Sequence, residues 1–170
     1  MGDDEFLQEA LTHVDMVYNL ARRMTSSRED AEDLVQETYA RALKAWRRER
    51  PRHMPPWLAT ICLNAARSLH RRRKNRPAEV LHGGLLDDLP AAGDTSEQAL
   101  AELERDAVRR ALARLPVEQR EAISLMDLCG FTAAQVGKML GVSRNTILSR
   151  VHRGHKRLAV LLEEVVGGEA

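Results

Sequence analysis

Apolar residues recur with helical spacing along most of this chain, and the pattern is clearest in residues 131–162. Thr132 followed by Gln135 is a capping-box pattern, which predicts the start of a first helix. Gly141 supplies a sharp turn, and Ser143 is placed to cap a second helix. The sequence therefore predicts two short helices joined by a tight turn.

The second of these helices has one apolar and one polar side. Its apolar stripe consists of Ile147, Val151, Gly154, Leu158 and Leu161. Its polar side carries Asn145, Thr146, Ser149, Arg150, Arg153, Lys156 and Arg157. Four cations without an acid suit the major groove of DNA, although a solvated basic helix in a helical hairpin would show the same pattern. We favour DNA binding because capping and charge segregation occur together.

Two more amphipathic helices are predicted near the N-terminus. The first covers residues 6–24, with an apolar face of Phe6, Ala10, Val14, Val17, Ala21 and Met24. The second runs from a cap at Ser27 to Trp46 and buries Ala31, Leu34, Val35, Thr38, Ala42 and Trp46. Its opposite face carries Asp33, Gln36, Glu37, Ala40 and Lys44. That face is either an ordinary solvated surface or a docking surface for a basic partner.

Residues 47–56 contain three prolines and predict a loop, after which Pro56 begins a helix. The apolar side of this helix is formed by Leu58, Ile61, Cys62, Ala65 and Leu69, and its polar side by Thr60, Asn64, Arg67 and Arg71. Six bases fall within residues 67–76, more than a helix C-terminus needs, and indicate a phosphate-binding surface. The loop beside Trp57 and Asn64 is a plausible cradle for an unstacked base.

Glycine, proline and acids then dominate a stretch without helical period, and we interpret residues 77–99 as a flexible acidic linker. Helical spacing resumes with Leu100, Leu103, Ala107, Ala111 and Leu115, and Val117 begins another helix that Gly130 ends. We therefore expect an all-α fold of two small helical domains, residues 1–76 and 100–166, joined by the linker. The C-terminal domain would be the helix-turn-helix.

Composition adds few constraints to this picture. The chain has 170 residues, 4% aromatic and 30% charged, with a formal net charge of +1. Cys62 and Cys129 have neither zinc-ligand spacing nor a disulfide framework, so we interpret them as small core side chains. No run of about 18 apolar residues occurs, and the N-terminus is acidic where a signal peptide would be basic. We expect a soluble, cytoplasmic protein without membrane insertion or cofactor.

Three stretches, in this order, resemble one protein family. They are DLVQETYARA at residues 33–42, WLATICLNAARSLHRRRKN at residues 57–75, and LPVEQREAISL at residues 115–125 followed by the helix-turn-helix. The chain resembles bacterial RNA polymerase sigma factors, specifically the extracytoplasmic-function (ECF) group of the sigma-70 family. The resemblance covers residues 6–76 and 100–162.

The resemblance implies a non-enzymatic factor that binds core RNA polymerase, melts and recognises the promoter −10 element and reads the −35 element. Polymerase binding would fall to Asp33, Gln36 and Glu37. The −10 element would contact Trp57, Thr60, Asn64, Arg67, Arg71, Arg72, Arg73 and Lys74. The −35 element would contact Ser143, Arg144, Asn145, Thr146, Ser149, Arg150, Arg153 and Arg157. The family also implies an anti-sigma factor as a regulatory partner.

The chain departs from the family pattern at two places. Relatives often carry Gly where Asn145 stands and a cation where Leu148 stands, so Leu148 contacts either a thymine methyl or the protein itself. The loop before Trp57 is rich in Arg and Pro where many relatives have aromatics. Neither element's base preference follows from the sequence.

Two other functions compete with this one. A free-standing helix-turn-helix regulator would act without polymerase, but it needs dimerisation, and no long heptad run offers it. A metal-dependent enzyme could use Asp30, Asp33 and Glu37 with one of His13, His53, His70 or His82. No histidine has ligand spacing to those carboxylates, which disfavours the enzyme.

Overall fold

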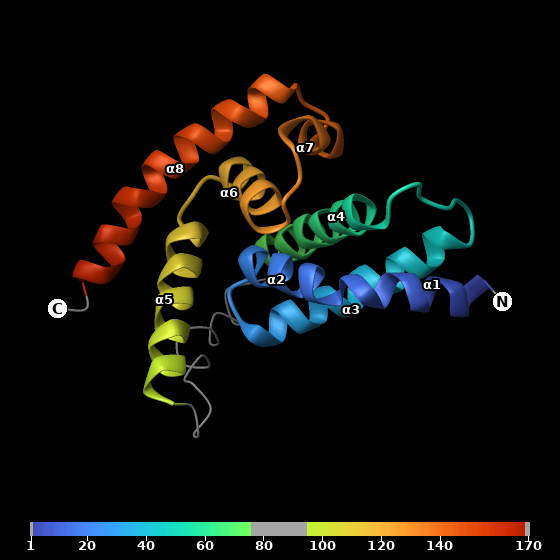
Figure 1. Cartoon of the computed structure of the whole chain (residues 1–170), viewed down its shortest axis with the longest axis horizontal. Coiled ribbons are helices and arrows are strands. Elements are labelled where there is room, and N and C mark those ends of the chain that lie inside the picture. Colours follow the sequence, from blue (N-terminus) through green and yellow to red (C-terminus); the bar gives the residue numbers. More distant parts are fainter. Residues whose placement is uncertain (1, 76–94, 169–170) are drawn as a thin grey trace.

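The computed structural model describes residues 2–75 and 95–168, and every regular element in these residues is helical. The N-terminal group contains α1 (Gly2–Ala10), the 3-10 turn η1 (Leu11–His13), α2 (Val14–Met24), α3 (Arg28–Trp46) and α4 (Met54–Lys74). The C-terminal group contains α5 (Ser96–Ala113), α6 (Val117–Ile123), the π-helical turn η3 (Ser124–Leu128), α7 (Ala133–Leu140) and α8 (Arg144–Gly167). The all-α fold with two helical domains is confirmed (Figure 1). The predicted linker covers residues 77–99, and residues 77–94 of it lie outside the described residues. Its predicted end is wrong, because Thr95 caps α5 and residues 96–99 form the first turn of that helix.

The N-terminal helices pack through apolar side chains, as their periodicity predicts. The buried core includes Phe6, Leu20, Leu34, Leu58 and Leu63. Two long side chains of α3 tie α1 to this core. Tyr39 donates its hydroxyl hydrogen to the Ala10 carbonyl (2.9 Å), and the Trp46 indole donates to the Gly2 carbonyl (3.0 Å). The N-terminal helix is thus anchored along its length.

The prediction of one continuous helix over residues 6–24 is wrong. The turn η1 interrupts it, and Val14 is 38% exposed although its spacing placed it on the apolar face. A 3-10 turn has about 3.0 residues per turn instead of about 3.6, so it rotates the apolar stripe of α2 relative to that of α1. Phe6 and Ala10 before the turn, and Val17 and Ala21 after it, remain buried.

Two further boundaries differ from the sequence-based expectation. Helix α4 begins at Met54, so Pro55 and Pro56 both stand in its first turn, where their missing amide hydrogens leave no intrahelical bond unmade. The helix predicted to begin at Val117 and to be ended by Gly130 changes from α- to π-helical at Ser124.

The C-terminal helices assemble around α8, which contacts α5, α6 and α7. The Thr132–Gln135 capping box begins α7, Ser143 caps α8, and Gly141 between them adopts the left-handed conformation (φ 70°). Ile147 and Val151 of α8 are buried. The predicted helix-turn-helix is therefore confirmed, but its second helix is not short, since α8 runs for 24 residues.

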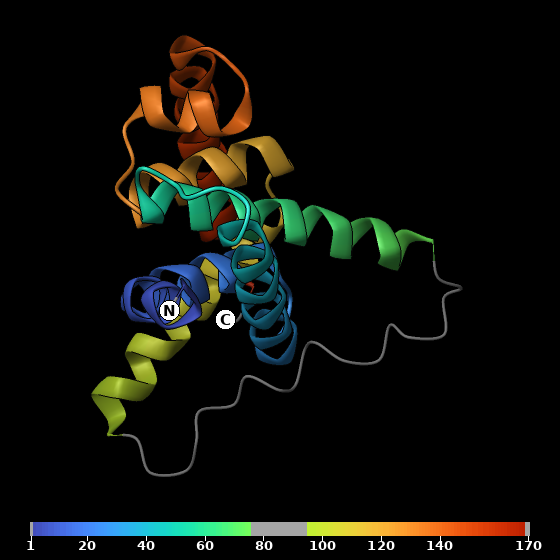
Figure 2. The same cartoon turned by 90° about the vertical axis from the view of Figure 1, so that its right-hand side faces the viewer.

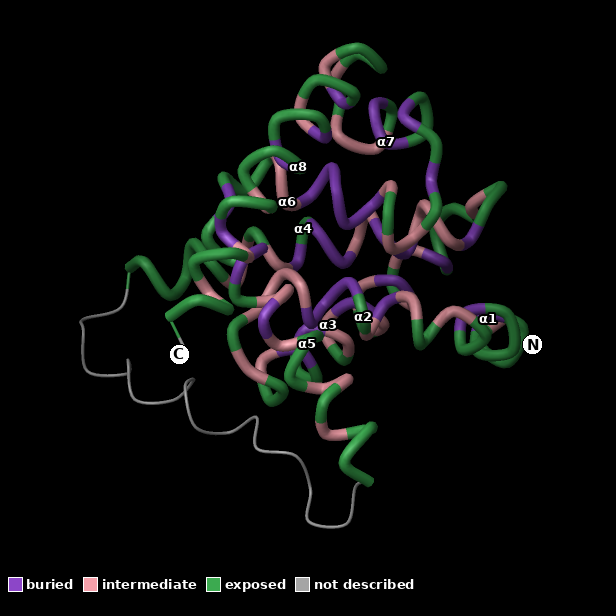
Figure 3. The backbone as a smooth tube through the Cα atoms, turned by 60° about the vertical axis from the view of Figure 1, so that its left-hand side comes forward, coloured by how far each residue is buried: buried purple, intermediate pink, exposed green. Residues whose placement is uncertain are grey.

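Helix α5 buries less of its predicted face than expected. Ala107, Ala111 and Leu115 are buried, but Leu100 and Leu103 are 59% and 53% exposed. The first turns of α5 extend past the helices on which its later turns pack (Figure 3). Helical spacing alone does not show where a packing partner ends.

The two helical groups lie against each other. Figures 1 and 2 show α4 between α2 and α3 on one side and α6 and α7 on the other. Contacts join α2 to α5 and η3, and α4 to α7, and buried residues of both groups form one hydrophobic cluster. The described residues thus adopt a closed arrangement.

Candidate nucleic-acid interface

Helix α3 presents the acidic surface that its sequence predicts. Asp33 and Gln36 are exposed and Glu37 is half-buried, all on one side of a helix begun by the Ser27 cap. Arg41 donates to Glu37 at 2.6 Å, and this bond lowers the pKa of the Glu37 carboxyl. The three side chains lie within two helical turns, so they can contact a basic partner together.

The polar side of α4 is divided between free and engaged side chains. Asn64, Arg71, Arg72 and Lys74 are exposed. Thr60 is half-buried and donates its hydroxyl hydrogen to the Pro56 carbonyl (2.8 Å). Arg73 instead donates to Asp30 of α3, which lowers the pKa of that carboxyl. Only part of the predicted basic surface is therefore free in this arrangement.

Arg67 on the same face is held by the other domain. Its Nε donates to Oε1 of Glu121 on α6 at 3.0 Å, and its Nη2 to Oε2 at 2.8 Å. Glu121 is 3% exposed, whereas the Arg67 side chain is 46% exposed. Because the two residues stand 54 positions apart, no local sequence pattern could have indicated this pair.

The loop before α4 is flanked by aromatics and by acids of α1. The Trp46 and Trp57 ring centroids are 6.5 Å apart, and the Arg50 guanidinium lies 4.8 Å from the Trp46 centroid. Arg47 donates to Asp3 (2.6 Å) and Arg50 to Glu5 (2.7 Å). Sequence reasoning missed these acids because they lie more than 40 residues from the loop. The opposite charges of α1 and of the loop are the only sequence feature that indicates this contact.

The polar side of α8 faces away from its core. Arg144, Asn145, Ser149, Arg153 and Arg157 are exposed, and Thr146 and Arg150 are half-buried. The Ser143 oxygen accepts from the Thr146 amide (3.1 Å) and lies 2.9 Å from the Thr146 hydroxyl. Leu148 is 38% exposed, so it projects partly from the surface that holds these side chains.

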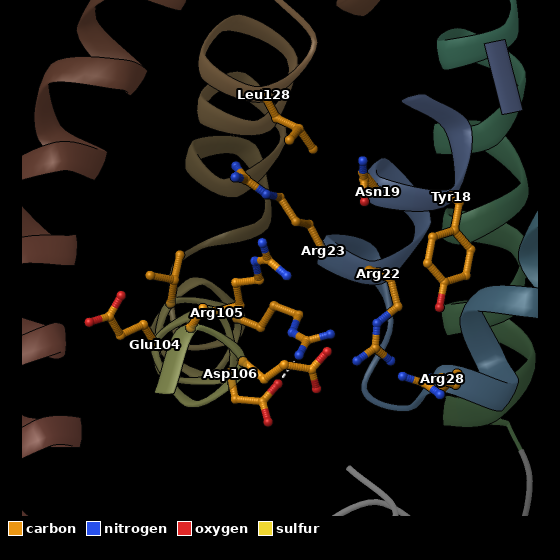
Figure 4. Close-up of a pocket in the computed structure, with 13 residues that line it drawn as sticks. Tyr18, Asn19, Arg22, Arg23, Arg28, Glu104, Arg105, Asp106 and Leu128 are labelled. Carbon is orange, nitrogen blue, oxygen red and sulfur yellow. Dashed lines mark ion pairs between the residues drawn. The ribbon is translucent and has the colours of Figure 1, made fainter. Parts of the chain in front are cut away.

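A polar cleft lies where the two domains meet. It encloses about 830 Å³, between Arg22, Arg23 and Arg28 on one side and Arg105 and Asp106 of α5 on the other (Figure 4). Asp106 also forms an ion pair with Arg109, so cations and carboxylates alternate in the lining. Because charges of both signs line the cleft, it offers neither an anionic nor a cationic ligand a consistently attractive surface.

The two cysteines behave as core side chains. Burial raises the pKa of the Cys62 thiol to about 12 and that of Cys129 to about 11. Both thiols stay protonated near neutral pH, and a protonated thiol is a poor nucleophile.

Neither a metal site nor a membrane span emerges from the described residues. In residues 2–75 and 95–168, no three His, Cys, Asp or Glu side chains gather as metal ligands. Across the same residues, none of the helices has the length and apolar character needed to cross a bilayer.

Comparison with known proteins connects these surfaces to one family. The model for Sigma-70 region 2 matches residues 10–76, and the model for Sigma-70, region 4 matches residues 105–158. The first match contains α2, α3 and α4, and the second contains α6, α7 and residues 144–158 of α8.

Individual relatives match across both regions. ECF RNA polymerase sigma factor SigE of Mycolicibacterium smegmatis is 35% identical over 91% of this chain, which spans 59% of SigE. ECF RNA polymerase sigma factor EcfG of Rhodopseudomonas palustris is also 35% identical, over 94% of this chain and 86% of EcfG.

Two solved structures share the arrangement of helices. The sigma factor RpoE of Bartonella quintana, crystallised with the anti-sigma factor NepR, is 29% identical with a TM-score of 0.75, covering 94% of this chain and 97% of RpoE. CnrH in complex with the cytosolic domain of CnrY is 26% identical with a TM-score of 0.69, covering 93% of this chain and 87% of CnrH. The chain therefore belongs to the ECF group of the sigma-70 family: it is a sigma factor, which directs RNA polymerase to promoters for transcription initiation.

Proposed function

We propose that three surfaces of this chain divide the work of transcription initiation. Asp33, Gln36 and Glu37 of α3 dock on core RNA polymerase, α4 and the loop before it bind the −10 element, and α8 reads the −35 element. One observation carries this assignment: an exposed acidic face on α3 is separated from two basic faces, within matches to region 2 and region 4 in that order.

The −10 surface combines a base-binding and a phosphate-binding part. Trp57, Thr60 and Asn64 stand at the N-terminal half of α4 beside the arginine-rich loop, where a stacked or hydrogen-bonded base of the melted strand can lie. Arg67, Arg71, Arg72, Arg73 and Lys74 follow toward the C-terminus and bind its phosphates.

The −35 surface is the polar side of α8. Asn145, Thr146 and Ser149 are short and suit contacts to base edges, whereas Arg150, Arg153 and Arg157 reach phosphates. Ser143 and Arg144 lie at the helix N-terminus, which favours a phosphate. The partial exposure of Leu148 supports contact with a thymine methyl.

Partners and location follow from the family. The similar structure of RpoE is a complex of a sigma factor with the anti-sigma factor NepR, which supports an anti-sigma factor as a partner here. CnrH was likewise solved in a complex, with the cytosolic domain of CnrY. We assign the chain to the cytoplasm, where its polymerase and promoters are, and assign it no catalytic activity of its own.

Run-off transcription over a fragmented bacterial genome, with purified core polymerase, tests the assignment. Wild type is expected to yield transcripts from shared start sites, whose upstream sequences give the −10 and −35 elements. The Asp33→Ala/Gln36→Ala/Glu37→Ala variant is expected to yield none.

A matched control replaces the same three residue types on other helices. Gln8→Ala/Glu9→Ala/Asp15→Ala alters exposed side chains of α1 and α2 and should leave the transcripts unchanged. If wild type yields no transcripts but binds a DNA sequence without polymerase, the chain is a free-standing helix-turn-helix regulator.

A further inference from the structure

The contact between Arg67 and Glu121 joins a proposed DNA-binding side chain to the opposite domain. Both carboxylate oxygens of Glu121 accept from the guanidinium, at 3.0 and 2.8 Å. A carboxylate in this two-point geometry offers the same pair of oxygens as a backbone phosphate. Arg67 cannot donate these hydrogens to Glu121 and to DNA at the same time.

The burial of Glu121 makes the contact strongly dependent on the closed arrangement. Glu121 is 3% exposed and, among the described residues, accepts side-chain hydrogen bonds from Arg67 alone. A buried carboxylate is unfavourable without a cation, because it has lost its water. Parting of the domains breaks both charge-assisted hydrogen bonds, and this loss opposes opening. The water that Arg67 and Glu121 regain offsets part of that cost.

Promoter geometry requires the domains to part. Elements centred at −35 and −10 lie about 25 base pairs apart, which is about 85 Å along the duplex. In the closed arrangement α8 packs on α6, and α6 touches α4 through Glu121. Helices in contact have axes about 8–10 Å apart, so the two DNA-binding helices lie on the order of 20 Å from each other. They cannot read both elements without breaking the Arg67–Glu121 pair.

We propose that Glu121 competes with promoter DNA for Arg67 and latches the two domains together until polymerase separates them. The latch rests on the proposed role of Arg67 in binding the −10 strand. Glu121 lies outside the residues assigned to either DNA element, and it lowers DNA binding by occupying a contact that the DNA needs.

The test compares Glu121→Gln with Glu118→Gln in the full chain. Glu118 lies on the same helix, is exposed and has no hydrogen-bond or ion-pair partner among the described residues, so its variant controls for the lost charge. Small-angle X-ray scattering gives the radius of gyration. Anisotropy of a labelled single-stranded oligonucleotide of mixed sequence gives DNA affinity across a salt series.

Glu121→Gln is expected to raise the radius of gyration and to strengthen DNA binding about tenfold. The gain arises because DNA no longer has to displace the charge-assisted contact of Glu121 with Arg67. The slope of log affinity against log salt should steepen by about 0.7, as one further phosphate contact on a single strand requires. Glu118→Gln should match wild type in both measurements. Equal radii and affinities for the two variants would overturn the latch.

Two further variants separate failure of the latch from failure of the proposed function. Arg67→Gln/Glu121→Gln should keep the larger radius but lose the gain in affinity. If the gain remains, Arg67 is not a phosphate contact. Its assigned role and the competition for it then fall, while the larger radius still shows that the pair holds the domains together. The exchanged pair Arg67→Glu/Glu121→Arg should restore the compact radius, because it can form the same ion pair with the charges swapped. A compact exchanged variant would show that the larger radius of Glu121→Gln comes from the lost pair and not from misfolding.

Discussion

Gly137 lies at a close approach of backbone within the helix-turn-helix. A Cβ atom at this position would lie 2.7 Å from the Val142 carbonyl oxygen and 3.4 Å from the Arg144 amide nitrogen. The Val142 amide also donates to the Gly137 carbonyl at 2.9 Å. Backbone atoms cannot rotate aside as side chains do, so a larger residue must displace α8 from α7.

We therefore expect Gly137→Ala to lower the free energy of unfolding by about 1–3 kcal/mol, the usual cost of overpacking. This loss would occur although alanine favours a helix over glycine by about 1 kcal/mol. Urea denaturation followed by circular dichroism measures it. Lys138→Ala, at the exposed neighbouring position, should change stability by no more than about 0.5 kcal/mol. A more stable Gly137→Ala chain would show that α7 and α8 are not this close.

Residues whose roles depend on near neighbours in sequence were predictable, and those that depend on distant contacts were not. The caps at Ser27, Thr132 and Ser143 act within three residues, and all three form the expected hydrogen bond. Arg67 was correctly placed on the polar side of α4, but its partner Glu121 belongs to the other domain. Only the tertiary arrangement brings that carboxylate to it.

The helices, like the single residues, were predictable only where their structure depends on local sequence. Periodicity located the helices because an amphipathic stripe is a property of the helix itself. Periodicity could not show that residues 11–13 tighten into a 3-10 turn, nor that α5 extends past its partners. Both depend on what the helix packs against, which its own sequence does not contain.

Helix α5 offers a direct measurement of this difference, because it carries the same side chain in two settings. Leu112 is 1% exposed and Leu103 is 53% exposed. Leu112→Ala should lower the free energy of unfolding by about 2–5 kcal/mol, since it removes buried methyl groups and leaves a cavity. Leu103→Ala should change it by about 0.5 kcal/mol or less. Equal losses in urea denaturation would mean that the first turns of α5 are packed in solution.

The whole molecule distributes its charge so that neither of the two proposed DNA-binding surfaces is large. The net charge is +1, and Asp30 and Glu121 each engage an arginine of the −10 surface. The closed arrangement also prevents the two domains from binding adjacent elements together. Polymerase would raise the affinity for the promoter by holding the two domains at the spacing of the two elements. Once one domain has bound its element, the other domain meets its own element at a high effective concentration.

The isolated chain should therefore bind its promoter duplex with a dissociation constant weaker than about 1 µM at physiological salt, the range of non-specific binding. Anisotropy of the labelled duplex, with and without core polymerase, measures the difference. The duplex is the promoter found by run-off transcription, and a scrambled duplex is the control. Tight, sequence-specific binding by the chain alone would contradict the need for polymerase.

The placement of Trp46 and Trp57 gives the molecule an optical reporter of its own. They are the chain's two tryptophans, they stand at opposite ends of the loop before α4, and their ring centroids are 6.5 Å apart. Because both tryptophans belong to the N-terminal domain, the tryptophan fluorescence of the full chain reports on that domain alone. Emission from the unlabelled protein would follow the surroundings of the proposed −10 surface without a dye being attached to it.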